Sequence, residues 1–528
     1  PILRLLSSDL ILDEPDDFDQ ADLPALSRLV HLVGLLGGRI LLSSATLPPD
    51  LIHGLFNAYF AGRTLYHRHQ NKPQPNIVCA WIDEQVQKSK AVQCPNSSDF
   101  IGAHLDFIVK RVDFLQRQPV RRCADILPLN LKYEKDKKEL FFAQLAQLLA
   151  ETAFSLHRQH HIQHPQKSET VSIGLIRIAN TKNIIQLAKA FNRSVKLNND
   201  VHIHLCCYHA KQLLLLRNML ESRLDRTLKR DEKQPEAIFE QPDIQQAMRK
   251  HPAKQHIFIV LATPVAEVGR DHDYDWAIVE PSSMRSIIQL AGRIWRHRPE
   301  KIANSPNLLI LQNNLRTLFG ENIAFTKPGF ESKEFKLSTH DMEELMPVEQ
   351  RQRVDSIVRI SKPQRLSPDN ILADLEHQVI KDLLNNDELN FVNAYWDDAA
   401  TANRAATHLQ ILTPFRAGRA EEEWLVIPDD HGFDVYSAEQ VSKLSLGQAA
   451  KHNYYLRYQA IDFQNPQVSS WLSTDLNTAL GQLQQKLPQN RVKEDNLKGL
   501  AIYYSRVALE ENEHCWSFNE WLGFWRNQ

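Results

Sequence analysis

Apolar runs alternate with an amphipathic segment over the first 50 residues of the chain. Leu10-Ile-Leu12 ends a short apolar strand, and the spacing of apolar residues over 23–36 predicts a helix. Gly37-Gly38 supplies the stop for that helix. Ile40-Leu-Leu-Ser43 then forms the next apolar strand. Because strand–helix–strand alternation is typical of a parallel sheet, this region is predicted to be part of an α/β lobe.

The same alternation returns in the middle of the chain and predicts a second α/β lobe. Apolar strands separated by helical segments are expected at 171–178, 201–205, 257–260, 276–279 and 308–311. The predicted organisation is therefore the C-terminal part of a first lobe, a second lobe, a charged helical linker and a smaller C-terminal domain. Their predicted ranges are 1–165, 166–330, 331–400 and 401–528.

Composition narrows the class of protein. The 528 residues are 43% hydrophobic and 24% charged, with a formal net charge of −2. No global basic field exists, so nucleic-acid binding would need a local basic lining. The six cysteines show no C-x-x-C spacing and are expected to be buried free thiols. No apolar run reaches membrane-spanning length, which predicts a cytoplasmic protein without a membrane partner.

An acidic box follows the first predicted strand. Asp13-Glu14-Pro15-Asp16 fits the pattern Asp-Glu-x-Asp. Nucleoside triphosphate hydrolysis needs one carboxylate that holds Mg²⁺ through water and a second that orients and deprotonates the attacking water. Asp13 is the candidate for the first role and Glu14 for the second. The alternative is a solvated acidic turn, since further aspartates continue the run.

Ser44-Ala-Thr46 ends the second predicted strand. In an ATPase of this design, the two hydroxyls would form hydrogen bonds near the acidic box and couple nucleotide state to movement between lobes. The tripeptide is short, and an ordinary strand-to-loop turn followed by Pro48-Pro49 is the alternative. Its distance from Asp13, one helix and one strand, favours the coupling role.

The segment from Ala262 to Asp275 follows a predicted buried strand. Thr263 is a candidate contact for a nucleic-acid phosphate, and Gly269 permits a tight turn. Asp271 is placed to accept a hydrogen bond from a ribose hydroxyl of ATP. The neighbouring His-Asp dipeptide is too little for a metal site.

Gln289-Leu-Ala-Gly-Arg-Ile-Trp-Arg296 fits Gln-x-x-Gly-Arg-x-x-Arg. A guanidinium stays charged and offers a planar fork of donors, which suits a transferring phosphoryl group. On a continuous helix, Gln289, Arg293 and Arg296 would share one face. Arg296 is the candidate finger on the γ-phosphate, Arg293 a supporting cation and Gln289 a nucleotide contact. The alternative is a basic surface helix.

Two strand ends in the second lobe are candidate nucleic-acid contacts. Asn180-Thr181 and Tyr208-His209 each follow a predicted strand, where polar side chains could meet a phosphate backbone. An ordinary helix cap or strand end explains either pair equally well.

A phosphate-cradling loop ending in Gly-Lys-Ser or Gly-Lys-Thr does not occur in the sequence. Such a loop precedes the acidic box in helicases, and only twelve residues precede Asp13 here. The first lobe would therefore lack strands and expose a sheet edge. We expect the C-terminal part of a longer enzyme, inactive by itself as an ATPase.

These motifs, in this order, resemble superfamily 2 helicases, and more narrowly the helicase–nuclease of type I CRISPR interference, subtype I-F. The likeness is carried by residues 12–19, 204–210 and 262–275 and by the motif that ends at Arg296. It implies two RecA-like parallel sheets, the first incomplete, that use ATP and Mg²⁺ to move 3′ to 5′ on single-stranded DNA. A separate HD nuclease domain with its own divalent metal would degrade the DNA.

The resemblance also implies partners. These are the CRISPR RNA-guided surveillance complex that recruits the enzyme, the CRISPR integrase and the N-terminal part of the same enzyme; a phage inhibitor protein is a further candidate. No nuclease residues are assigned, because His340-Asp341 lacks the other members of an HD set. A general DNA or RNA repair helicase fragment and a non-catalytic DNA- or protein-binding fragment remain alternatives.

Overall fold

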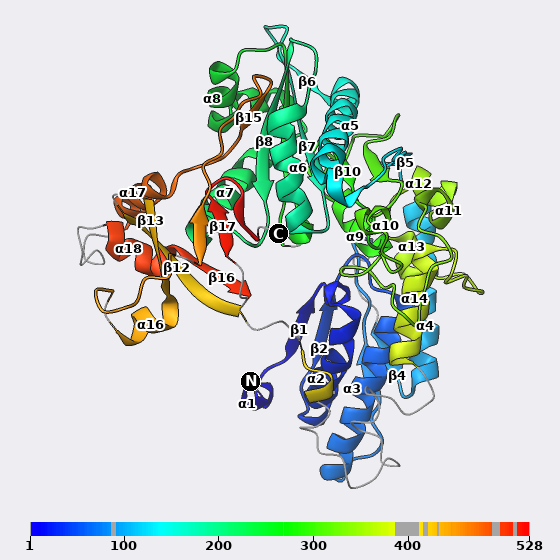
Figure 1. The fold of residues 1–528 in the computed structure, drawn as a ribbon. Coiled ribbons are helices and arrows are strands. Elements are labelled where there is room, and N and C mark those ends of the chain that lie inside the picture. The colour runs from blue at the N-terminus through cyan, green and yellow to red at the C-terminus, as the bar shows by residue number, and fades with distance from the viewer. Residues whose placement is uncertain are drawn as a thin grey trace. The chain divides into compact units, whose positions relative to one another are not determined.

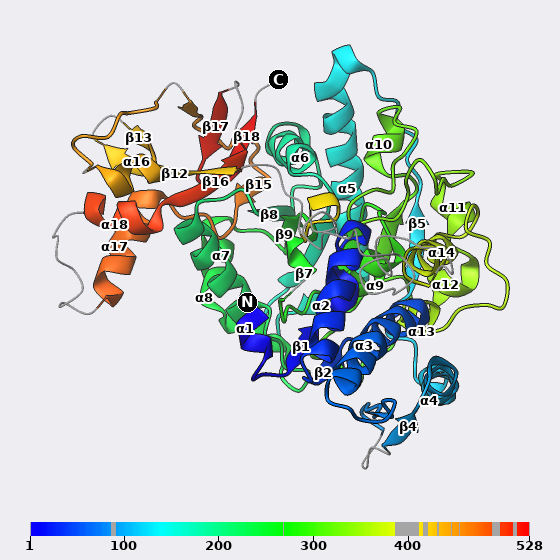
Figure 2. The same ribbon diagram turned by 90° about the horizontal axis from the view of Figure 1, so that it is seen from below.

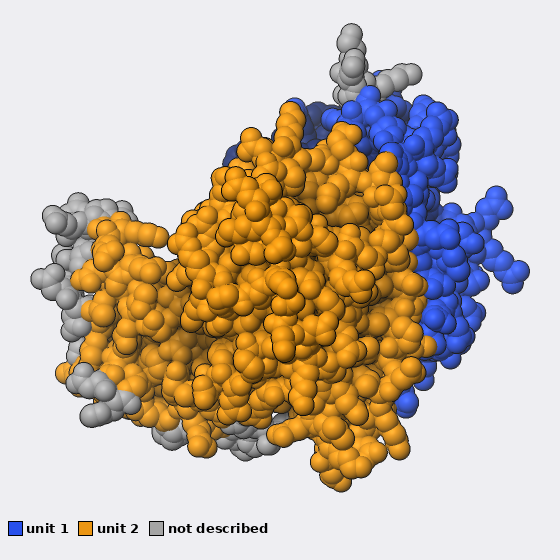
Figure 3. Space-filling view, turned by 90° about the horizontal axis from the view of Figure 1, so that it is seen from above, with its two compact units in different colours: residues 1–120, 282–288, 321–418 blue, residues 121–281, 289–320, 419–528 orange. Residues whose placement is uncertain are grey.

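The computed structural model describes most of the chain. The described residues are 2–85, 91–267, 269–385, 411–415, 421–429, 432–444, 446–453, 455–487, 497–510 and 515–526. They form two compact units, coloured separately in Figure 3. Unit 1 comprises residues 1–120, 282–288 and 321–418; unit 2 comprises residues 121–281, 289–320 and 419–528. Each unit is described by itself.

A parallel strand pair begins unit 1. β1 (Leu10–Asp13) pairs with β2 (Ile40–Ser43), and α2 (Leu23–Leu35) connects them. This confirms the strand–helix–strand prediction for the first 50 residues. α3 (Pro49–His69) then packs against α2. The two helices approach closely because Gly62 has no side chain: a Cβ there would lie 2.1 Å from the carbonyl oxygen of His31.

The rest of unit 1 is mainly helical. An antiparallel pair, β3 and β4, precedes α4, and short helices lead to α14, which packs on α3 and α2. The region expected to be a linker is therefore folded into unit 1 as far as residue 385, and residues 386–410 lie outside the described part. The bounds are α1 (Ile2–Leu5), β3 (Ile77–Cys79), β4 (Val92–Cys94), α4 (Ser97–Arg117), α11 (Met342–Leu345), α12 (Val348–Gln352), α13 (Ile357–Ile360) and α14 (Leu372–Leu384).

Unit 2 is built on an eight-stranded sheet with the order β15-β8-β9-β7-β10-β11-β5, and β6 pairs with β7. Every pairing along that order is parallel; β6 pairs antiparallel. All residues of β7 and β8 are buried, as expected for strands covered on both faces. The bounds are β5 (Ala124–Leu127), β6 (Ile162–Gln163), β7 (Thr170–Arg177), β8 (Val201–Tyr208), β9 (Gln255–Ala262), β10 (Trp276–Val279), β11 (Leu308–Leu311) and β15 (Val468–Ser470).

This sheet confirms the predicted α/β class with mostly parallel strands, and all five strands expected in the second lobe are present. The boundary differs from the expected position near residue 165. β5 pairs with β11, and α5 (Lys138–His160) packs beside α6 (Thr181–Ser194) on the sheet (Figure 1). Residues 121–165 therefore belong to unit 2, because the apolar face of α5 is buried against this sheet.

Other helices of unit 2 connect its strands. They are α7 (Leu214–Thr227), α8 (Pro242–Lys250), α9 (Met284–Ala291) and α10 (Leu315–Leu318), and α9 begins within the segment 282–288 that is counted with unit 1. None of the described helices is long and apolar enough to cross a membrane.

The C-terminal region, drawn in yellow to red in Figure 2, also belongs to unit 2 from residue 419 onward. It was expected to be a separate domain from about residue 401, but β15 adds to the edge of the large sheet beside β8. Its described residues also form two small sheets and three helices, and α17 packs against α7. They are β12 (Glu421–Asp429), β13 (Gly432–Ser437), β16 (Arg506–Glu510), β14 (Leu456–Tyr458), β17 (Trp516–Asn519), β18 (Gly523–Arg526), α16 (Ala438–Lys443), α17 (Leu476–Lys486) and α18 (Leu497–Tyr504).

All six cysteines are free thiols, as expected. Their burial differs from the prediction, since Cys79 and Cys123 are half-buried and Cys515 is exposed.

Candidate active site

The acidic box lies at the carboxyl end of the β1–β2 pair. β1 ends at Asp13, whose register partner is Ser43, and the Glu14 amide donates to the Ser43 carbonyl at 2.6 Å. Asp13 is exposed and Glu14 half-buried. Glu14 has φ 47° and ψ 55°, the left-handed region, which turns the chain sharply after the strand. In open α/β sheets ligands bind at this edge.

Asp16 shows that the box is not a solvated acidic turn. The residue is only 3% exposed. Ser44 Oγ donates to Asp16 Oδ1 and Thr46 Oγ1 donates to Asp16 Oδ2, each at 2.6 Å. The structure thus joins the two sequence motifs through Asp16, which sequence reasoning did not single out. The pattern Asp-Glu-x-Asp contained that signal in its fourth position.

Two arginines outside the predicted motifs complete the surroundings of Asp16. Arg285 Nη1 donates to the Asp16 carbonyl at 2.7 Å, and Arg359 Nη2 lies 3.6 Å from Asp16 Oδ2. Both side chains are buried. No sequence pattern could have paired them with Asp16, because they are distant in the chain and belong to no motif.

The turn after β9 places the other predicted nucleotide residues, all in unit 2. Thr263 follows β9, is buried, and its amide donates to the Tyr208 carbonyl at 3.2 Å. Gly269 has φ +65° and nothing within 4 Å of an ideal Cβ, so its freedom is needed for the backbone conformation. The Asp271 carboxylate is 71% exposed.

The helix expected to carry Gln289, Arg293 and Arg296 is shorter than predicted. α9 ends at Ala291, so that expectation of one shared helical face is wrong. Gly292 follows the helix, Ile294 forms a parallel bridge with Tyr274, and Trp295 has φ 49°. Because Ile294 pairs with Tyr274, the residues after Ala291 do not continue the helix. Gln289 remains half-buried on α9.

The two arginines of this segment have different surroundings. Arg293 is 6% exposed; its guanidinium donates to the carbonyl of Glu267 (Nε at 3.2 Å) and to that of Arg270. It therefore holds the turn that contains Gly269. Arg296 is 42% exposed and pairs with the exposed carboxylate of Asp271. This pair lowers the pKa of Asp271, chiefly through the hydrogen bond from Arg296.

A buried ionic cluster anchors the segment just beyond Arg296. Arg298 is 1% exposed and donates to Asp273 (Nε to Oδ2, 3.0 Å) and Asp275 (Nη1 to Oδ1, 2.7 Å). Arg230 Nη1 lies 3.5 Å from Asp275 Oδ2. Burial would raise the pKa of Asp275, but Arg230 and Arg298 hold it well below the ordinary value. The alternative of a basic surface helix therefore fails for Arg298.

Within the described part of the chain, no set of three or more His, Cys, Asp or Glu side chains could hold a metal ion. His272 Nε2 lies 2.9 Å from Asp225 Oδ1, and His340 Nε2 lies 2.9 Å from Glu331 Oε1. Both His-Asp dipeptides noted in the sequence thus have structural roles.

The predicted nucleic-acid contacts divide into two groups. Asn180 is the exposed N-cap of α6, and its side chain accepts from the Lys182 amide at 2.8 Å; Thr181 is half-buried beside it. Their contact with DNA stays a prediction. Tyr208 and His209 are fully buried, and His209 Nε2 lies 2.8 Å from the Leu522 carbonyl oxygen, so the expectation that they meet a phosphate backbone is wrong.

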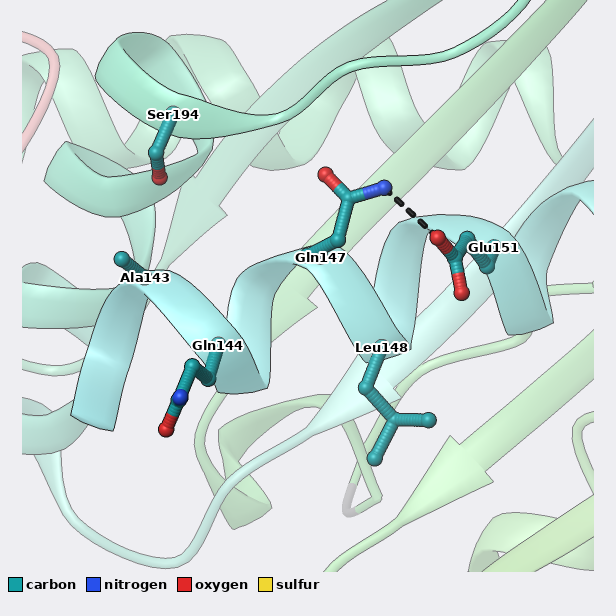
Figure 4. Close-up of a pocket in the computed structure, with 6 residues that line it drawn as sticks. All are labelled: Ala143, Gln144, Gln147, Leu148, Glu151 and Ser194. Carbon is teal, nitrogen blue, oxygen red and sulfur yellow. Dashed lines mark hydrogen bonds between the residues drawn. The ribbon is translucent and has the colours of Figure 1, made fainter. Parts of the chain in front are cut away.

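An open groove of about 390 Å³ lies elsewhere in unit 2, on α5 (Figure 4). Gln147 and Glu151 line it and are hydrogen-bonded to each other at 2.7 Å. Its other lining residues are Ala143, Gln144, Leu148 and Ser194. None of them is a predicted site residue, so the groove does not mark the candidate site.

Comparison with known proteins agrees with the motif order. Residues 170–299 match the family model described as CRISPR-associated nuclease/helicase Cas3, C-terminal. The chain is 40% identical over 531 residues to the CRISPR-associated nuclease/helicase Cas3 subtype I-F/YPEST of Pseudomonas aeruginosa, a match that covers 99% of this chain and 47% of that protein. The protein of the same description from Pectobacterium atrosepticum is 41% identical, with 83% of this chain and 40% of that protein covered.

A crystal structure of T. fusca Cas3 with ATP is also similar, with a TM-score of 0.37 and 19% identity over 59% of this chain and 30% of that one. The chain spans about half the length or less of the curated relatives that it matches. By sequence, it belongs to the family of CRISPR-associated nuclease/helicases of subtype I-F and corresponds to their C-terminal part.

Proposed function

We propose that this chain is the motor portion of an ATP-dependent helicase–nuclease that moves on single-stranded DNA and degrades foreign DNA in type I CRISPR interference. The observation that carries the proposal is the contact between the acidic box and the Ser44–Thr46 motif through Asp16. A translocating ATPase needs such a link, because its hydrolysis must be coupled to movement.

The carboxylates of the acidic box differ in exposure, and the exposed one is available for ATP and Mg²⁺. Each carboxylate oxygen of the buried Asp16 already accepts from one hydroxyl, whereas Asp13 is exposed at the end of β1. Asp13 would hold hydrated Mg²⁺, which neutralises charge on the phosphates when bound. Glu14, half-buried on a sharply turned backbone, would orient the attacking water and accept its proton.

The other residues predicted to contact the nucleotide belong to unit 2. Asp271 would accept from the ribose, Gln289 would contact the nucleotide, and Arg296, supported by Arg293, would stabilise charge on the γ-phosphate. The candidate phosphate contacts for DNA are Thr263, Asn180 and Thr181.

The proposal concerns the complete protein, because the relatives are about twice as long as this chain. Movement in the 3′-to-5′ direction, recruitment by the RNA-guided surveillance complex and association with the CRISPR integrase follow from the resemblance. The same holds for a metal-dependent nuclease in the N-terminal part of the enzyme, and for binding of a phage inhibitor.

Glu14→Gln in the complete enzyme tests the hydrolytic role. We expect ATP hydrolysis stimulated by single-stranded DNA to fall by about 10³-fold, while ATP still binds, because the amide cannot accept the proton. Asp19→Asn is the matched control: Asp19 belongs to the same acidic run and pairs only with the exposed Lys327, at 3.5 Å, among the ion pairs of the described residues. Undiminished turnover in Glu14→Gln would contradict the assignment.

The choice of nucleic acid separates the alternatives. Stimulation by single-stranded DNA and co-purification with a surveillance complex support the CRISPR function, whereas stimulation by RNA supports a general RNA helicase. ATP hydrolysis by the isolated 528-residue chain would contradict the expectation that it is inactive alone.

A further inference from the structure

Four residues with buried charged side chains form a ring inside unit 1, closed by two side-chain ion pairs and by contacts to backbone atoms. They come from three distant parts of the sequence: Asp16 after β1, Arg285 at the start of α9, Arg359 on α13 and Glu376 on α14. Their exposed fractions are 3%, 4%, 1% and 1%. Two carboxylates and two guanidinium groups balance in charge, so the ring can be buried without a net charge.

Each link of the ring is a direct contact. Arg359 Nη2 lies 3.6 Å from Asp16 Oδ2, and Arg359 Nη1 donates to Glu376 Oε2. Glu376 Oε1 accepts from the backbone amides of Met284 and Arg285. The Arg285 guanidinium closes the ring, since Nη1 donates to the Asp16 carbonyl at 2.7 Å.

The ring ends on the N-terminus of the helix that carries Gln289. The first amides of a helix have no intrahelical partners, and a carboxylate there also favours the helix dipole. Glu376 fills both roles for α9, although it lies about 90 residues further along the chain. The start of α9 is thereby linked to Asp16, the same aspartate whose carboxylate accepts hydrogen bonds from the Ser44 and Thr46 hydroxyls.

Stability alone does not account for such a ring. Burying ion pairs costs several kcal/mol per ion in desolvation, and well-packed apolar residues in their place are often as stable or more stable. The charged contacts instead fix relative positions. Asp16, Arg359 and the first turn of α9 are joined by them, so none of the three can move independently of the others.

We propose that Arg359 and Glu376 are positioning residues for ATP hydrolysis, which relay the state of the acidic box from Asp16 to the first turn of α9. This inference rests on the proposed function. A shift of Asp16 during the nucleotide cycle changes the place of Arg359, and through Glu376 the place of the helix that leads to the arginine segment.

Glu376→Gln in the complete enzyme tests the relay, because glutamine keeps an oxygen for the α9 amides but loses the charge that binds Arg359. The matched control is Asp374→Asn on the same helix. Asp374 is also a buried carboxylate that accepts from a backbone amide, that of Ser367 at 2.8 Å, but it is outside the ring. ATP turnover with and without single-stranded DNA, the KM for ATP and the Tm are measured for both variants.

The relay predicts a DNA-stimulated kcat about tenfold lower in Glu376→Gln, with the KM for ATP within about twofold of wild type and Asp374→Asn near wild type in both. Arg359→Lys keeps a charge but has no planar fork of donors to span two carboxylates, so it should also lower kcat while leaving the KM for ATP nearly unchanged. Wild-type turnover in Glu376→Gln would overturn the inference, as would equal losses in both variants that follow equal drops in Tm. If the wild-type enzyme itself shows no DNA-stimulated hydrolysis, the proposed function fails instead.

Discussion

Replacing Arg298 by leucine is the sharpest test of how the arginine segment is held in unit 2. Arg298 is 1% exposed, and its guanidinium donates to both carboxylate oxygens of Asp273, to Asp275 Oδ1 and to the Tyr274 carbonyl. Leucine fills part of the volume but supplies no donor. Asp273 would keep only the His297 amide, at 2.9 Å, among its hydrogen bonds within the described residues.

The expected loss in the free energy of unfolding follows from the burial of this ion pair. Breaking a buried ion pair by removing one partner costs about 3–5 kcal/mol, because the remaining charge stays desolvated. Asp275 retains Arg230 and the Ile173 amide, so Asp273 carries most of that cost. Unit 2 spans 303 residues. At about 2.1 cal/mol/K of unfolding entropy per residue, each kcal/mol corresponds to about 1.6 °C, so the Tm of unit 2 should fall by roughly 5–8 °C.

Scanning calorimetry of Arg298→Leu against Arg296→Leu provides the measurement. Arg296→Leu is the matched control, because it makes the same substitution two residues away, in an exposed ion pair. The expected loss in the free energy of unfolding is below about 1 kcal/mol there. Hydrogen exchange gives a local readout, since Asp275 Oδ2 accepts from the Ile173 amide at 2.8 Å on the adjacent strand. That amide should exchange faster only in Arg298→Leu. Equal Tm values for the two variants would refute the reasoning.

Two further predictions concern chemistry and pH. Arg296→Ala in the complete enzyme should slow DNA-stimulated ATP hydrolysis by about 10³-fold without lowering the Tm, and a change below about threefold would favour a surface role for Arg296. Burial lowers the pKa of His157 to about 3 from 6.5, so the folded state binds fewer protons and the free energy of unfolding falls as pH drops below about 6.5. His157→Asn, which can still bond Ser172 and Thr170, should therefore show a shallower acid-side decline in denaturant titrations; an unchanged decline would contradict this cause.

The central strands and the acidic box could be predicted from sequence because their signals are local. Long apolar runs mark the strands β7, β8 and β9, which are buried on both faces. The turn at Glu14 and the hydroxyls of Ser44 and Thr46 lie at the ends of such runs. Their meeting at Asp16 follows from the parallel pairing of β1 and β2.

Edge strands and helix ends were missed for physical reasons. β5 reads Ala-Asp-Ile-Leu and β15 reads Val-Ser-Ser, so polar residues interrupt both edge strands and neither shows a continuous apolar run. Sequence patterning therefore placed the boundaries at 165 and 401. The end of α9 had a local signal in Gly292, but the bridge of Ile294 to Tyr274 that fixes it is a tertiary contact.

The structure divides the arginines of the segment after α9 by what each would lose on binding a nucleotide. Arg293 and Arg298 are buried and donate to several acceptors, so moving either onto a phosphate would leave buried groups unpaired, at a cost of several kcal/mol. Arg296 would give up only its exposed ion pair with Asp271, and such a pair contributes about 1 kcal/mol or less. Since Asp271 would turn to the ribose when ATP binds, both members of that pair can change partners together. A finger is thus expected at Arg296, held on both sides by arginines that stay in place.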